Sequence, residues 1–136
     1  MRIFLDANVL FSAAKSDGAV RQLIGLLAEA GHVLCADGYV IEEARRNLAA
    51  KAPEGVSVLA KLLTRMHVAN AQSGDAALEA SLPLPAKDRP VLAASIRQGC
   101  AALVTGDRTH FGALYGRTIH GVAVHSPRSL AEALLG

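Results

Sequence analysis

The chain has 136 residues, of which 51% are hydrophobic and 19% are charged, and its formal net charge is +2 at pH 7. This length and composition predict one compact domain spanning residues 1–136, which excludes a disordered chain and makes a second domain unnecessary. The small positive charge permits a nucleic-acid partner but argues against a protein that coats DNA through a dense basic surface.

The start of the chain carries no predicted targeting segment. Its one apolar stretch, RIFLDANVL, is interrupted by Asp6, so neither a signal peptide nor a membrane span is expected. Cys35 and Cys100 lie in apolar segments without a CxxC spacing, and we expect small core residues there rather than a disulfide. These features predict a cytoplasmic protein without a membrane partner.

Short apolar runs alternate with segments of helical periodicity along most of the chain. The predicted elements are a strand at 2–5, a helix around 20–27, a strand at 32–36, helices at 39–50 and 56–66, a weak strand at 67–69, one helical turn (75–81) in a looped stretch at 70–88, a helix at 90–98, a strand at 101–105, a short helix at 109–116, a strand at 121–125 and a helix at 129–135. This alternation is typical of βαβ units and predicts an α/β domain with a parallel sheet.

Four acidic residues lie in apolar surroundings at the ends of predicted elements. Asp6 closes the first strand, and Asp107 follows the strand at 101–105 by two residues. Ligands of open parallel sheets bind outside the carboxyl ends of the strands, so both carboxylates face that region. Glu43 lies on the helix after the second strand and Asp88 at the entrance of a later helix, from which both can project over the same edge. The pattern predicts four carboxylates in one site.

Such a cluster needs a cation, because two like charges about 4 Å apart repel by several kcal/mol at an effective dielectric constant of about 20. Oxygen ligands favour Mg²⁺ or Mn²⁺, and the sequence offers no closely spaced Cys or His set for Zn²⁺. The amide of Asn8 would hold the turn or orient a ligand without adding charge. Each acid also has a structural interpretation: a cap for Asp6 and Asp88, a turn residue for Asp107 and a solvated helix position for Glu43.

At these residues the chain resembles a known family. The segments FLDANVL, VIEEARRNL, KDRPVLAAS and LVTGDRTHF occur in the order found in PIN-domain ribonucleases, and the similarity spans nearly the whole chain. The ending GVAVHSPRSL resembles the branch of VapC-like toxins of toxin–antitoxin systems. The resemblance implies a three-layer α/β/α sandwich with a central parallel sheet, an endoribonuclease dependent on Mg²⁺ or Mn²⁺, and often a homodimer.

The resemblance also assigns roles to individual residues. It implies that the catalytic and metal-binding acids are Asp6, Glu43, Asp88 and Asp107, supported by Asn8 and Thr105. The Thr105 hydroxyl could bond a first-strand carboxylate or a metal-bound water. Glu42 stands beside Glu43, so the second acid is ambiguous by one position. We prefer Glu43 because it precedes Leu48 at the interval usual in the family.

The predicted function is a metal-dependent endoribonuclease, the toxin of a toxin–antitoxin pair, with RNA as substrate and a cognate antitoxin and a second copy of the chain as partners. The basic residues next to the proposed acids could hold RNA phosphates; they are Arg45, Arg46, Arg89 and Arg108. His110 could assist a proton transfer, but a single histidine after a turn is more often structural.

Two other functions remain open at this point. One is a PIN-like scaffold that binds RNA or protein without catalysis. The other is an aspartyl-phosphate phosphotransferase with Asp6 as nucleophile. The second acid expected for that chemistry is replaced by Asn8, and no obvious lysine follows the later strand, which disfavours the phosphotransferase.

Overall fold

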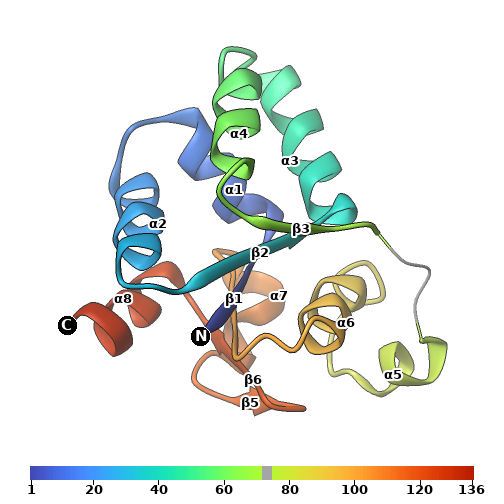
Figure 1. Cartoon of the computed structure of the whole chain (residues 1–136). Helices are drawn as coiled ribbons and strands as arrows, with labels where there is room; N and C mark the ends of the chain where they lie inside the picture. Colours follow the sequence, from blue (N-terminus) through green and yellow to red (C-terminus); the bar gives the residue numbers. More distant parts are fainter. Residues whose placement is uncertain (72–74) are drawn as a thin grey trace.

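A six-stranded sheet crosses the middle of the molecule in the computed structural model, which describes residues 1–71 and 75–136 (Figure 1). The strands lie side by side in the order β3 (His67–Ala69), β2 (Val33–Asp37), β1 (Arg2–Leu5), β4 (Ala102–Val104), β6 (Val122–His125) and β5 (Thr118–Ile119). Neighbouring strands are parallel except β5, which pairs antiparallel with β6. The sheet is therefore mixed but mostly parallel.

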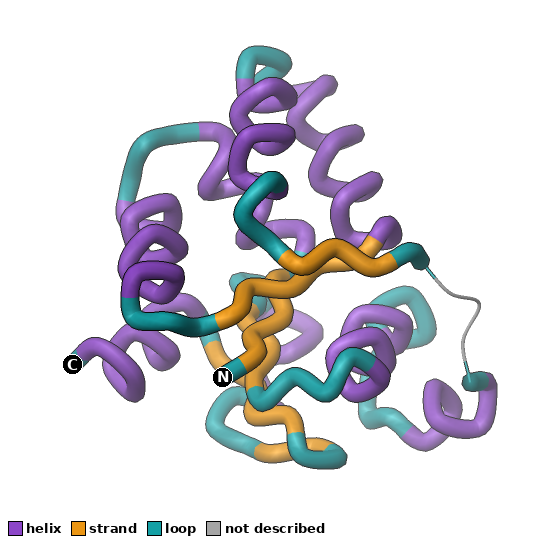
Figure 2. Tube along the Cα trace, viewed as in Figure 1, coloured by secondary structure: helices purple, strands orange, loops and turns teal. Residues whose placement is uncertain are grey.

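Helices lie on both sides of this sheet, as Figure 2 shows. In chain order they are α1 (Ala7–Lys15), α2 (Ala19–Glu29), α3 (Gly38–Lys51), α4 (Gly55–Leu63), α5 (Ala76–Ser81), α6 (Arg89–Arg97), α7 (Arg108–Phe111), the 3₁₀ turn η1 (Gly112–Leu114) and α8 (Pro127–Leu135). Helix α1 packs against α2, α3 and α4, whereas α5 packs on α6 across the sheet from α2 and α8 (Figure 1). The predicted three-layer α/β/α sandwich is confirmed. Within the described ranges, no helix is long and apolar enough to cross a lipid bilayer.

The central strand β1 is buried on both faces, because Ile3, Phe4 and Leu5 are at most 1% exposed. A strand covered by helices on both sides is a continuous apolar run rather than an alternating one, which is why its position was predictable. Cys35 and Cys100 are both buried and unbridged, as expected.

Two elements differ from the sequence-based expectation. No helix was predicted between Asp6 and Gly18, where the structure has α1, whose buried residues Val9, Leu10 and Ala13 recur at helical spacing. The two-residue strand β5 was also not predicted. Within the looped stretch predicted at 70–88, the helical turn forms α5, and residues 72–74 lie outside the described residues.

The strand order places a crevice at the carboxyl ends of β1 and β4. From β1 the chain adds β2 and β3 on one side, and it later returns to add β4 and β6 on the other side. The helix after β1 therefore leads to one side of the sheet and the helix after β4 leads to the other side. Where two neighbouring strands have connections that diverge in this way, a crevice opens at their carboxyl ends. Asp6 follows β1 directly, and the segment Thr105–Asp107 follows β4.

Candidate metal centre

A cavity of about 270 Å³ lies at this edge of the sheet. All four predicted acids line it, although each comes from a different part of the chain: Asp6 from the end of β1, Glu43 from α3, Asp88 from the start of α6 and Asp107 from the loop after β4. The other lining residues are Ala7, Asn8, Phe11, Tyr39, Asn47, Lys51, Lys87 and Val91. The structure thus brings together the acids that the sequence placed at separate element ends.

Asp6 is the most deeply buried of the four acids, with 5% of its surface exposed. Its Oδ1 accepts a hydrogen bond from the backbone N–H of Ala7 (2.7 Å), at the start of α1. Its Oδ2 accepts hydrogen bonds from the Thr105 hydroxyl (2.8 Å) and the Asn8 amide (3.2 Å). The carboxylate therefore caps α1, and three donors fix its orientation at the cavity wall.

Asn8 and Thr105 join the ends of β1 and β4. The Asn8 amide also donates to the Thr105 hydroxyl oxygen (3.3 Å), and its carbonyl oxygen accepts from the backbone N–H of Gly106 (2.7 Å). The same Thr105 hydroxyl oxygen accepts from the backbone N–H of Asp107 (3.2 Å). Both polar side chains hold the loop that carries Asp107 against the loop that carries Asp6.

The electrostatics of the cavity disfavour negative charge. Burial raises the pKa of the Asp6 carboxyl to about 6, against the lowering effect of the hydrogen bonds from Thr105 and Ala7. The charges of Glu43 and Asp88 raise this pKa further. Burial, with the charges of the same carboxylates, also raises the pKa of Tyr39, whose hydroxyl donates to the Lys87 carbonyl oxygen (2.9 Å). A cation in the cavity would relieve this repulsion.

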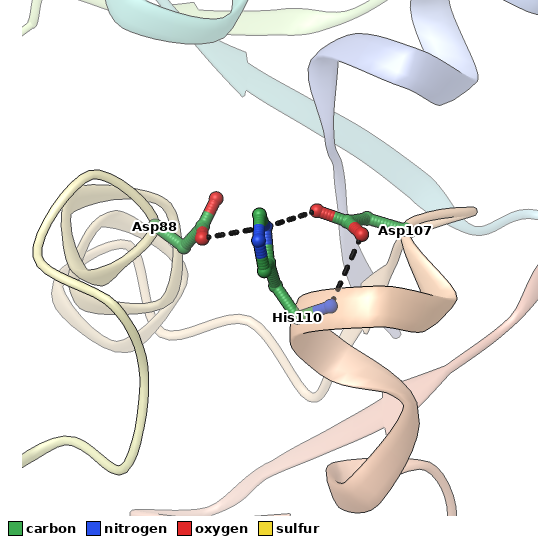
Figure 3. Close-up of side chains that lie close together, drawn as sticks. All are labelled: Asp88, Asp107 and His110. Carbon is green, nitrogen blue, oxygen red and sulfur yellow. Dashed lines mark hydrogen bonds and ion pairs between the residues drawn. The ribbon is translucent and has the colours of Figure 1, made fainter.

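Asp88, Asp107 and His110 form a close cluster (Figure 3). Asp107 caps α7 by accepting a hydrogen bond from the backbone N–H of His110 (3.1 Å), and its other oxygen lies 2.9 Å from the imidazole Nδ1. Oδ2 of Asp88 lies 3.0 Å from the same nitrogen, yet within the described part of the chain this buried oxygen accepts no hydrogen bond. Asp88 also caps no helix through its side chain, so the capping interpretation fails for this acid.

One face of α3 lines the cavity. Tyr39, Glu43, Asn47 and Lys51 recur every four residues, which places them on the same side of a helix. Glu42 faces elsewhere and forms an exposed ion pair with Arg45 (2.9 Å). Of the two adjacent glutamates, Glu43 is therefore the one at the cavity. The spacing from Glu43 is the sequence signal that could have revealed Asn47 and Lys51.

The basic residues at the cavity are lysines. Lys51 and Lys87 line it, whereas among the described residues that do so there is no arginine. Of the four predicted RNA-binding arginines, Arg45 pairs with Glu42, and the Arg89 side chain donates to the Leu84 carbonyl oxygen (2.8 Å). Arg46 and Arg108 are exposed. Among the described residues that line the cavity, none of these four arginines is included.

The raised pKa of Asp6 predicts that the metal-free protein loses stability as the pH rises. Between the ordinary pKa of 3.8 and the folded-state pKa of about 6, the folded state binds more protons than the unfolded state. The free energy of unfolding therefore falls across this interval, on the order of 3 kcal/mol from this one group. Urea denaturation in EDTA at several pH values between 4 and 7 measures the fall.

The variant Asp6→Asn should lack this contribution. Burial also raises the pKa of Asp37, which contributes the same trend to both proteins, so the difference between their curves isolates Asp6. Asp17→Asn, at an exposed acid between α1 and α2, serves as the matched control and should follow wild type. Parallel curves for wild type and Asp6→Asn would contradict the prediction.

Comparison with known proteins agrees with this architecture. Residues 2–109 match the sequence profile of the PIN domain. The chain is similar in structure to VapBC2 from Rickettsia felis bound to a promoter DNA fragment (15% identity, TM-score 0.69, covering 93% of this chain and 98% of that chain). It is also similar to the sarcin–ricin loop cleaving toxin VapC20 of Mycobacterium tuberculosis (17%, 0.58, 82% and 93%) and to FitAcB from Neisseria gonorrhoeae (19%, 0.59, 93% and 98%). At these identities the likeness establishes the fold, and no curated protein sequence matches the chain.

Proposed function

The chain belongs to the PIN domain family, and on that basis we propose that it is a metal-dependent endoribonuclease that acts as the toxin of a toxin–antitoxin pair. One observation carries the proposal: Asp6, Glu43, Asp88 and Asp107, from four separate elements, line a single cavity at the carboxyl edge of the sheet. Capping explains the positions of Asp6 and Asp107 one by one, but it does not offset the repulsion among four carboxylates around one cavity, which a bound cation would.

The donor set fits Mg²⁺ or Mn²⁺. The four carboxylates would hold the ion, and Asp88 Oδ2 is a buried oxygen that lacks a hydrogen bond among the described residues, as expected of an atom reserved for a cation. Burial disfavours the charged form of Asp6, and a cation bound beside it would offset this cost. When bound, a divalent cation would activate water and stabilise the leaving oxygen of a phosphodiester.

The remaining side chains would position the reacting groups. The hydrogen bonds from Thr105 and Asn8 hold the Asp6 carboxylate in one orientation, which avoids the cost of reorganisation during the reaction. Lys51 and Lys87 would bind RNA phosphates next to the acids, because both line the same cavity. Exposed Arg46 and Arg108 would extend this contact to neighbouring phosphates.

The proposed partners are an antitoxin and a second copy of the chain. The similar solved structures include toxin–antitoxin assemblies, VapBC2 and VapBC from Salmonella typhimurium, both bound to DNA, which supports a cognate antitoxin for this chain. We propose that the pair acts in the cytoplasm, together with its RNA substrate.

The test is cleavage of total cellular RNA by the purified protein with Mn²⁺, with Mg²⁺ and with EDTA. The nuclease cleaves only when a metal is present. A scaffold would bind RNA without cutting it, and a phosphotransferase would instead accumulate a covalent aspartyl-phosphate. Either of those results would contradict the proposal.

A further inference from the structure

We infer that His110 is a nitrogen ligand of the metal, beside Asp88 and Asp107, and that this ligand makes the centre prefer Mn²⁺ to Mg²⁺. The inference rests on the proposed function, since it concerns the same metal. It adds a ligand that the four acids do not include and a choice between two ions that those acids leave open.

The geometry of the cluster suits three ligands of one ion. Nδ1 of His110 lies 2.9 Å from Asp107 Oδ2 and 3.0 Å from Asp88 Oδ2, and one ligand atom from each residue lies within 4.8 Å of the others. Adjacent ligands of an octahedral ion with bonds of about 2.1 Å are about 3.0 Å apart. Figure 3 shows the imidazole ring between the two carboxylates, with Nδ1 facing both.

Hydrogen bonding alone does not satisfy this cluster. Nδ1 carries at most one hydrogen, so it cannot make a full hydrogen bond to Asp107 and to Asp88 at the same time. Asp88 Oδ2 then remains buried at 3.0 Å from the same nitrogen, with no hydrogen bond from any described residue. A buried acceptor left in this way is costly. A cation removes the conflict, because it accepts a lone pair from the imidazole and from both carboxylates at once.

The backbone presents His110 for this role. Its N–H is bound by the Asp107 carboxylate (3.1 Å), and the next residue, Phe111, is completely buried. The imidazole therefore projects from a short helix, α7, which is held at its start by the Asp107 cap and at its end by the buried Phe111 side chain. The ring itself is 28% exposed, so an ion can reach its Nδ1 atom.

A nitrogen ligand changes which ion binds best. Mg²⁺ is a hard cation that is held by oxygen atoms and retains its waters, whereas imidazole is a ligand of the first-row transition ions. An imidazole in place of one oxygen should weaken Mg²⁺ binding more than Mn²⁺ binding. The five histidines of the chain include no other member of this cluster among the described residues.

Pulsed electron paramagnetic resonance of the Mn²⁺-loaded full chain tests the inference directly. Wild type should show ¹⁴N modulation from a coordinated imidazole, and labelling with [¹⁵N]histidine should remove it. His110→Gln should lose the modulation, while His67→Gln, at an exposed position on the edge strand β3, should retain it. In calorimetric titrations, wild type should bind Mn²⁺ more tightly than Mg²⁺. In His110→Gln, the dissociation constant for Mg²⁺ divided by that for Mn²⁺ should be smaller than in wild type by about tenfold or more.

The possible results distinguish a failure of the inference from a failure of the proposed function. If Asp107→Asn abolishes Mn²⁺ binding but wild type shows no nitrogen modulation, the metal centre stands and His110 is not a ligand. Modulation that survives in folded His110→Gln also overturns the inference, and His110→Asn is the second variant if the first does not fold. If wild type binds no Mn²⁺ at all, both the inference and the metal-dependent function are wrong.

Discussion

Asp6→Asn is expected to abolish Mn²⁺-dependent RNA cleavage, with a loss of about a thousandfold or more. Asparagine matches aspartate in size and keeps one carbonyl oxygen for the N–H of Ala7, so the cap on α1 survives. The substitution removes one of the negative charges that attract the metal. The same change relieves repulsion from Glu43 and Asp88 in the metal-free protein. It also places an amide NH2 where Oδ2 accepts hydrogen bonds from Thr105 and Asn8, and the loss of these bonds offsets the relief, so the variant should still fold.

Activity and folding must be measured on the same preparations. Cleavage of total RNA is followed with Mn²⁺, Mg²⁺ and EDTA, and the fold is checked by circular dichroism and urea denaturation. Asp17→Asn, which removes an exposed acid outside the cavity, should cleave like wild type. If Asp6→Asn cleaves as fast as wild type with the same metal dependence, the proposed site is wrong.

Phe111→Ala is expected to lower the free energy of unfolding by about 3–5 kcal/mol. Phe111 is completely buried, and it ends the four-residue helix α7 that begins beside Asp107. A helix of one turn has no stability of its own, so its position depends on this packing. Truncation should therefore also loosen His110 and weaken metal binding.

Urea denaturation measures the loss of stability, and titration with Mn²⁺ measures the effect on the site. Phe111→Leu, which keeps most of the buried volume, should cost no more than about 1.5 kcal/mol. A loss below about 1 kcal/mol for Phe111→Ala would show that α7 does not depend on this side chain.

The central parallel strands were predictable because they are short apolar runs that helices bury on both faces, whereas the exposed edge strand β3 gave only a weak signal. β1 and β4 show this most clearly, since their residues Ile3–Leu5 and Ala102–Val104 are almost completely buried. Helix α1 was missed because its apolar residues follow the strand after a single acid, so the change from strand to helix leaves no loop. The structure shows that Asp6 itself makes this change by capping the helix.

The acids of the site were predictable from their positions at element ends, but their neighbours were not. Lys51 lies two helical turns from Glu43 and reaches the cavity only because α3 presents that face inward. His110 could not be predicted as a ligand because its neighbour Asp88, at the start of α6, is close to it only in the folded chain. In the sequence, one histidine after a turn carries no sign of that distant carboxylate.

The proposed function requires that Asp6, Glu43, Asp88 and Asp107 hold a divalent metal in one cavity. Anomalous diffraction at the manganese edge, from crystals of wild type grown with Mn²⁺, tests it most directly. We expect an anomalous peak within the cavity, in contact with carboxylate oxygens of these residues, and no such peak in Asp6→Asn or Asp107→Asn. Crystals that bind Mn²⁺ only elsewhere on the protein, or that leave this cavity without an anomalous peak, would contradict it.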